Sequence, residues 1–339
     1  MQSQNAAAPT QTEAQDGNTA DGQQELKVGA DLTRHGSLRE AIPHLTEAQK
    51  LGADPYATGV NLGICYLGTG RNRDAIAILE SLRAGGSRTS TVDKLLAQAY
   101  VADGQVKAAY DVFTEAAAAN PKDESVYEFF ADACTDHQQY SLGLHTVERG
   151  LQELPDSARL HYERAVFLAR LGRLEEGKPE FDRATQLEPA GYIGYLALVQ
   201  KELYDDNLDA ANETLHRAIK AGHRDYQMLS LLGTVLLHEG AAPGQPEFAE
   251  AQAALEESAK DRPDYSATQI ALGKVYLMQG HFQEAVDHLE MARNLEPDNP
   301  AVYANLASAY SRLGDRAKAR QMEAQVERLL AEKKSSAIR

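Results

Sequence analysis

A repeat of 34 residues constrains the fold of this chain more than any other feature of its sequence. When the first repeat is taken to start at Gly22, the next six follow at intervals of 34 residues, and two more begin at Ser266 and Pro300. Nine units fit in the 339 residues. A period of this length predicts one array of similar units that pack on their neighbours, in place of two or three globular domains.

Each unit is predicted to be a hairpin of two helices. In the eighth unit apolar residues fall at helical spacing over 266–278, Gly280 interrupts the pattern, and a second amphipathic run covers 282–295. The small residues Gly273 and Ala285 are expected where the two helices approach closely. Pro297 stops the second helix, and the Asp and Asn after it offer short side chains to start the next one.

The order of small, aromatic and apolar residues in this unit resembles the tetratricopeptide repeat. The residues that carry the resemblance are Leu272, Gly273, Tyr276, Gly280, Ala285, Leu289, Ala292 and Pro297. The resemblance implies an all-α, right-handed superhelical solenoid of about nine tetratricopeptide hairpins with a C-terminal capping helix. It also implies a non-catalytic scaffold or assembly factor that binds a protein or peptide in the concave groove lined by the first helix of each repeat.

The sequence divides into three expected segments. Residues 1–21 are rich in Gln, Ala, Asn and Thr and nearly free of large apolar residues, so a disordered tail is expected there. The array is expected over 22–314 and continues to 325. Residues 326–339 are predicted to form a capping helix and tail. The sixth unit has Asp206 where a turn glycine belongs, and the seventh carries about six extra residues at 241–246, which we expect to form a longer surface loop.

No motif of a catalytic or metal site is present in the sequence. It contains no phosphate-binding glycine loop, no G-x-S-x-G, no H-E-x-x-H and no C-x-x-C. The ten histidines are scattered, and the two cysteines, Cys65 and Cys134, fall in first helices two repeats apart, so both are expected to be buried small residues. We therefore expect no enzyme activity, no metal and no cofactor.

Charge and hydropathy restrict the partners and the compartment. A net charge of −16 disfavours binding to nucleic acid, and no 18-residue apolar run is present that would insert into a membrane. The first residues lack the basic start and apolar core of a secretory signal, yet they resemble the polar spacer that follows a removed signal. Cytoplasmic and periplasmic or secreted locations therefore both stay open.

The candidate binding residues lie at the first-helix positions that line the groove in the tetratricopeptide family. Glu128, Asp132 and Asp136 are spaced by four residues and so form an acidic stripe on one helix face. Together with nearby aromatic rings, this stripe predicts a site for a basic segment, although a solvated face of an acidic protein has the same pattern. The predicted groove residues are Lys94, Gln98, Glu128, Phe129, Asp132, Asp136, Tyr162, Glu163 and Tyr204.

Two other functions remain open at this stage. The chain could be a structural component of a cell-envelope assembly or an oligomer that uses the edges and convex face of the solenoid. It could also be a receptor for a small molecule or glycan. The Lys and Asn set of the carboxylate clamp found in chaperone-binding members of the family is absent, so recognition of a chaperone tail is not expected.

Overall fold

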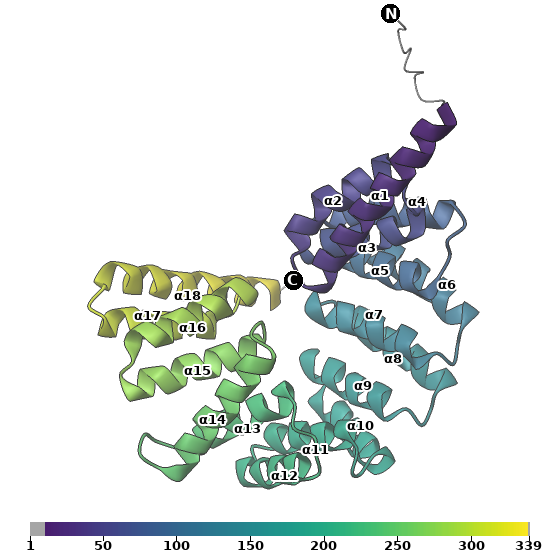
Figure 1. Cartoon of the computed structure of the whole chain (residues 1–339). Coiled ribbons are helices and arrows are strands. Elements are labelled where there is room, and N and C mark those ends of the chain that lie inside the picture. Colours follow the sequence, from purple (N-terminus) through teal and green to yellow (C-terminus); the bar gives the residue numbers. More distant parts are fainter. Residues whose placement is uncertain (1–10, 338–339) are drawn as a thin grey trace, which may run out of the picture. The chain divides into compact units, whose positions relative to one another are not determined.

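The computed structural model describes residues 11–337, and side-chain burial for residues 19–332 (Figure 1). Over this part of the chain the secondary structure consists of eighteen α-helices and no strand, which confirms the predicted all-α fold. The helices are α1 (Gln11–Arg34), α2 (Leu38–Lys50), α3 (Pro55–Gly68), α4 (Asn72–Ala84), α5 (Ser90–Ala102), α6 (Val106–Ala119), α7 (Glu124–Asp136), α8 (Tyr140–Glu153), α9 (Ala158–Arg170), α10 (Leu174–Leu187), α11 (Tyr192–Tyr204), α12 (Leu208–Lys220), α13 (Tyr226–His238), α14 (Pro246–Asp261), α15 (Ser266–Gln279), α16 (Phe282–Leu295), α17 (Pro300–Arg312) and α18 (Arg316–Ala337).

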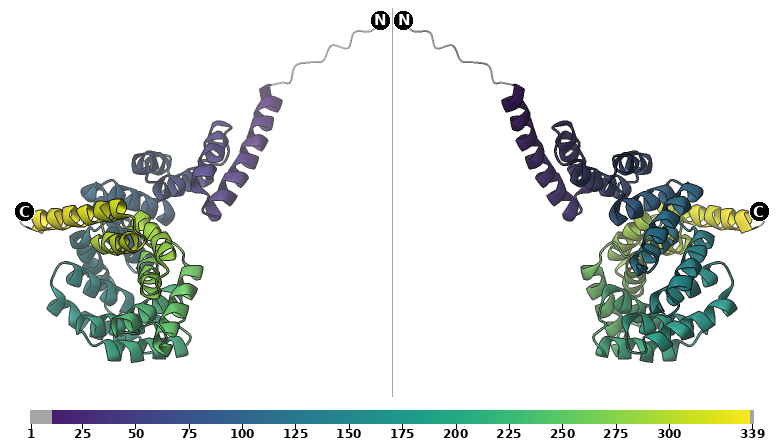
Figure 2. Two further views of the ribbon diagram at one scale, coloured as in Figure 1. Left: turned by 90° about the vertical axis from the view of Figure 1, so that its left-hand side faces the viewer. Right: turned by 90° about the vertical axis from the view of Figure 1, so that its right-hand side faces the viewer.

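Consecutive helices pair into hairpins, so that eighteen helices make the nine predicted units (Figures 1 and 2). The chain divides into two compact units, residues 1–180 and 181–339, and the division falls inside α10. In the first unit the first helices of successive hairpins pack together, α5 on α7 and α7 on α9. In the second unit α13 packs on α15 and α15 on α17 in the same way.

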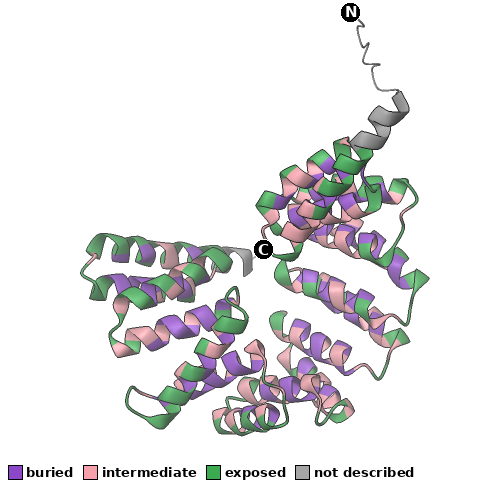
Figure 3. Ribbon diagram, viewed as in Figure 1, coloured by how far each residue is buried: buried purple, intermediate pink, exposed green. Residues whose placement is uncertain are grey.

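In four of the hairpins a glycine on the first helix meets a buried leucine on the second. A Cβ atom placed on Gly273 would lie 2.5 Å from Cγ of Leu289, and one on Gly29 would lie 2.6 Å from Cγ of Leu45. Both leucines are fully buried. The close approach needs glycine because any side chain would overlap the leucine. Figure 3 shows the result, with buried residues on the helix sides that face neighbours and exposed residues at the turns.

Gly143, in the first turn of α8, is explained by the same kind of close packing. Glycine lowers helix propensity by about 1 kcal/mol relative to alanine. Here a Cβ atom would lie 2.3 Å from Cζ of Phe167, a fully buried ring of α9. The glycine therefore makes room for an aromatic side chain that joins the fourth hairpin to the fifth.

Hydrogen bonds to the closing proline connect successive hairpins. In four repeats the side chain of the fourth residue bonds to the carbonyl of the proline that ends the repeat before it. Tyr127 donates to Pro121 over 2.9 Å, and Tyr303 donates to Pro297 over 2.8 Å. His161 Nε2 and Gln269 Nε2 occupy the same place, 3.0 and 2.7 Å from the carbonyls of Pro155 and Pro263. Each such bond satisfies a backbone carbonyl in the connection between two hairpins.

The turns follow the sequence pattern with informative exceptions. Gly280 adopts φ 80°, the left-handed conformation that ends a helix without strain in glycine. Asp206 takes the corresponding place in the sixth unit with φ 55°, so the turn forms there without glycine. The extra residues of the seventh unit extend the connection between α13 and α14, where the Ala242 N–H donates to the Gln245 side chain over 2.8 Å.

Both ends of the array differ from the sequence prediction. α1 begins at Gln11, so residues 11–21 are helical and not a disordered tail, because this stretch continues the helix that packs in the first hairpin. Residues 1–10 and 338–339 lie outside the described part of the chain. α18 runs unbroken over Arg316–Ala337, so the boundary placed at 325/326 does not separate two helices. The exposed Arg320 and Glu323 stand where α16 has buried apolar residues, which suits the end of an array.

We predict that Gly273→Val lowers the free energy of unfolding by about 1–3 kcal/mol, because its side chain overlaps Leu289 in a packed interior. Urea denaturation followed by circular dichroism measures the change. Shortening the partner with Leu289→Ala should make the double variant less destabilised than the sum of the two single changes. Strict additivity of the two changes would show that the residues are not in contact.

Candidate functional site

The predicted site residues fall into two groups that belong to different units. Lys94 and Gln98 lie on α5, while the acidic stripe and Phe129 lie on α7. Tyr162 and Glu163 lie on α9, which packs on α7, so the structure brings these eight residues onto three neighbouring helices of the first unit. Tyr204 belongs to the second unit, where its exposed ring lies 5.9 Å from that of Phe181.

Arg159 is the cation around which the acidic residues gather. Its guanidinium Nη2 lies 2.8 Å from Oε1 of Glu163 and 3.2 Å from Oδ1 of Asp132. It therefore joins the stripe on α7 to the carboxylate on α9. Arg159 is not among the residues predicted from the sequence, although it is the second residue of the fifth repeat, which is a groove position, and lies one helical turn before Glu163.

Glu163 is a buried carboxylate and not a solvated one. Only 5% of the residue is exposed, and burial raises the pKa of its carboxyl group to about 7 even though Arg159 acts in the opposite direction. Burial also raises the pKa of Glu128, Asp132 and Asp136. Because the Asp132 side chain is still 58% exposed, solvent limits the effect there, and Glu163 is the group that titrates near neutral pH.

A small apolar crevice opens beside the stripe. Two of the residues that line it, Phe113 and Phe130, stack with ring centroids 4.8 Å apart. Lys94 stands at its rim and donates a hydrogen bond of 2.6 Å to the Ser125 hydroxyl. The residues that line the crevice come from α5, α6 and α7 and are Asp93, Lys94, Ala97, Phe113, Ala116, Val126, Phe129 and Phe130. The predicted residues Lys94 and Phe129 thus share one hollow, next to Glu128.

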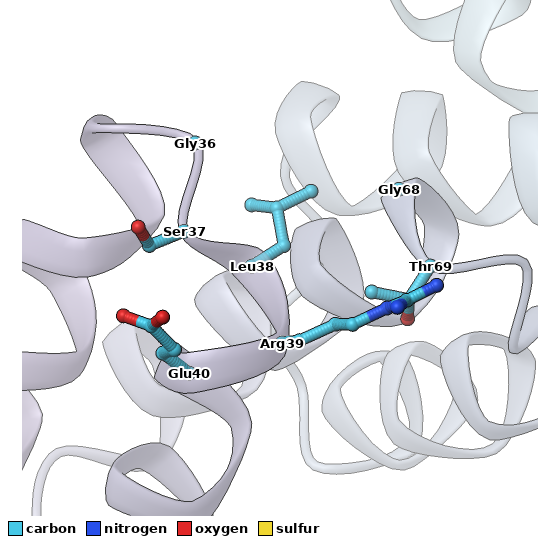
Figure 4. A pocket seen from close by; sticks show the side chains of 7 residues that line it. All are labelled: Gly36, Ser37, Leu38, Arg39, Glu40, Gly68 and Thr69. Atoms are coloured by element: carbon cyan, nitrogen blue, oxygen red, sulfur yellow. The ribbon is translucent and has the colours of Figure 1, made fainter.

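A second hollow lies at the turn between α1 and α2 (Figure 4). It is lined by Gly36, Ser37, Leu38, Arg39, Glu40, Gly68 and Thr69. The Leu38 side chain stands in its middle, and the Arg39 side chain extends toward Thr69. Because Arg39 and Glu40 are exposed and point in different directions, no set of polar groups converges here on one ligand atom.

Metal-ligating side chains do not cluster in the described residues. No three His, Cys, Asp or Glu side chains among them are placed to hold a metal ion. Cys65 and Cys134 are free thiols, fully buried as predicted, and burial raises the pKa of both. In the same part of the chain no helix is both long and apolar enough to cross a membrane.

Comparison with known structures identifies the same architecture. A tetratricopeptide repeat protein from Parabacteroides merdae is 16% identical, with a TM-score of 0.53, and the match covers 75% of this chain and 98% of that one. A chain from the APC/C hetero-tetramer Cut9-Hcn1 is also 16% identical, with a TM-score of 0.56, over 86% of this chain and 56% of that one. At this level of identity the likeness concerns the fold alone.

Comparison by sequence gives the family. No curated protein matches the chain. One family profile described as tetratricopeptide repeat matches residues 32–99, 244–304 and 277–332, and a second with the same description matches residues 131–191. These segments cover more than half of the 339 residues. The hairpins, their packing and these matches agree, and the chain belongs to the tetratricopeptide repeat family.

Proposed function

We propose that this protein is a non-catalytic scaffold that binds a partner protein or peptide on the first-helix face of α5, α7 and α9, and that the bound segment is basic. The observation that carries the proposal is the position of Arg159. Its guanidinium is held between Asp132 and Glu163, with Glu128 close enough to raise its pKa further. The protein's own side chain thus occupies the kind of site that an arginine or lysine of a partner would use.

The spacing of the stripe favours an extended segment. Carboxylates four residues apart on a helix are spaced about 6 Å apart along its axis. Alternate residues of an extended chain are spaced about 6.8 Å apart, which is a similar distance. A segment with basic residues at alternate positions can therefore lie along α7 and meet Glu128, Asp132 and Asp136 in turn. The ion pairs would fix its register, and their strength would fall with salt concentration.

The crevice supplies the apolar part of recognition. Exposed ion pairs contribute little affinity by themselves, whereas burial of an apolar side chain contributes about 25 cal/mol per Å². The hollow beside Phe129 is bounded by aromatic rings and lies within one helical turn of Glu128 and Asp132. We infer that the partner places one apolar side chain against the partly exposed ring of Phe129, which lines this crevice, next to its basic residues.

Reversing the stripe tests the proposal. The variant with Glu128→Arg, Asp132→Arg and Asp136→Arg should bind a ten-residue peptide that has alternating arginines and one central leucine at least tenfold more weakly than the wild-type chain. Isothermal titration calorimetry measures the affinity, and circular dichroism checks that the variant is folded. Equal affinity of the variant and the wild-type chain would rule out the stripe as the binding site.

A matched control separates a local effect from the change in net charge. Glu153 is an exposed carboxylate on α8, a second helix of the same unit. Glu153→Arg should leave the affinity for the basic peptide within about twofold of wild type, because the long-range effect of one charge is screened beyond about 10 Å at ordinary salt.

The titration of Glu163 predicts a pH dependence of binding. As pH rises from 6 to 8 the carboxyl group loses its proton and the site gains one negative charge, so the affinity for the basic peptide should rise. Glu163→Gln should bind more weakly than wild type at pH 8 and should lack this part of the pH dependence. Calorimetry at both pH values measures it, and a variant that keeps the wild-type pH profile would exclude Glu163 as the cause.

The same loss of a proton from Glu163 should lower the stability of the folded protein as pH rises, whereas it should raise the affinity for the basic peptide. The folded protein keeps the Glu163 proton up to a pKa of about 7, whereas the ordinary value is 4.5, so the contribution of this group to stability falls as pH rises between these values. The free energy of unfolding of Glu163→Gln, relative to wild type, should therefore increase by up to about 3 kcal/mol between pH 5 and pH 8. Urea denaturation at the two pH values measures this difference, and a constant difference would contradict the buried, ionisable state of Glu163.

A further inference from the structure

In the second compact unit, residues 181–339, Lys274 holds the repeat position that Asp132 of the acidic stripe holds in the first compact unit. Lys274 lies on α15 and is the ninth residue of its repeat, as Asp132 is of the fourth. Lys274 is partly buried. Among the described residues no carboxylate lies within ion-pair distance of its ammonium group, whereas Lys94 and Lys201 on other first helices are each bonded to an oxygen atom.

Apolar residues lie on the same side of α15 as Lys274. One helical turn before Lys274 lies Ile270, and one turn after it lie Leu277 and Met278. Residues three or four apart share one side of a helix, so all three lie on the same side of α15 as Lys274. Met278 is 45% exposed, while Ile270 and Leu277 pack in part against the last two hairpins. This side of α15 is thus a strip of apolar side chains with the positive charge of Lys274 near its centre.

The adjoining first helix continues the strip. α13 packs on α15, and its Leu231 and Leu237 hold the same repeat positions as Ala271 and Leu277. His238 ends α13 at the thirteenth position of its repeat, and desolvation and the positive charge of Lys274 lower its pKa. Its imidazole is itself a potential cation, so it cannot serve as the counter-ion of Lys274.

We propose that this face of α13 and α15 binds a partner segment in which a carboxylate stands between apolar side chains. In a chain with a net charge of −16, a partly buried lysine without a carboxylate is a complementary site for an acidic group. The exposed Met278 adjusts its shape easily and suits an apolar contact. The proposal concerns the second unit alone and does not depend on the basic partner proposed for the first.

The test uses the full chain and two acetylated, amidated twelve-residue peptides that are identical except at one central position. Both carry leucines on either side of that position, which is Glu in one peptide and Gln in the other. Isothermal titration calorimetry should give an affinity for the Glu peptide at least tenfold higher than for the Gln peptide. Lys274→Gln should remove this preference and Lys274→Arg should keep it.

Two control variants make the result specific. Lys260→Gln removes one exposed positive charge from α14, a second helix of the same unit, and should leave the affinity for the Glu peptide unchanged. Asp132→Arg should weaken the binding of the basic peptide and leave the binding of the Glu peptide unchanged. A loss of both activities in one single variant would indicate a folding defect, which circular dichroism would reveal, and the Lys274→Arg variant then still decides the proposal.

Three outcomes would overturn the inference. Equal binding of the Glu and Gln peptides by the wild-type chain would show that the face recognises no carboxylate. Unchanged binding in Lys274→Gln would place the acidic site elsewhere. Sedimentation that shows self-association of the wild-type chain, abolished by Lys274→Glu, would mean that a second copy of the chain covers this face.

Discussion

The close approach of two helices inside each hairpin is the constraint on which the rest of the structure depends. In four of the repeats a glycine on the first helix faces a buried leucine on the second, as Gly63 faces Leu79 and Gly233 faces Leu255, with Cβ positions 3.0 and 2.4 Å from leucine atoms. Alanine takes the place of glycine in the other repeats of the pattern, except for Val199 in the sixth. This contact sets the distance between the helices of a hairpin, and that distance fixes where the first helices of successive hairpins meet.

The sequence predicted the hairpins because their determinants are local and periodic. A small residue, an aromatic residue, a turn glycine and a closing proline recur at fixed intervals, and each acts within its own hairpin or on the next one. The two ends were predicted less well. The helical start at Gln11 and the unbroken α18 depend on how far a helix continues past its last periodic residue, and composition does not decide this.

The sequence predicts where the candidate residues lie along the first helices and does not predict their electrostatics. Periodicity placed Glu128, Asp132 and Asp136 on one face, and the structure brings Glu163 to the same place. That Glu163 is buried, and that Arg159 bridges two helices, depends on the packing of α9 on α7, which no single helix pattern contains. Lys274 shows the same limit, because its repeat position is evident from the sequence while the lack of a nearby carboxylate is a property of the packed neighbours. The same repeat position thus carries a negative charge at Asp132 in the first compact unit and a positive charge at Lys274 in the second.

The bonds to the closing prolines have a consequence for how such a chain tolerates change. The acceptor is a backbone carbonyl, which is present whatever side chain the accepting residue has, and tyrosine, histidine and glutamine all reach it from the fourth position of the next repeat. These side chains share little except a donor at a similar distance from the backbone. At these four junctions the bond therefore requires a donor at the right distance and not one residue type, so the fourth position can vary while the stacking of the hairpins is kept.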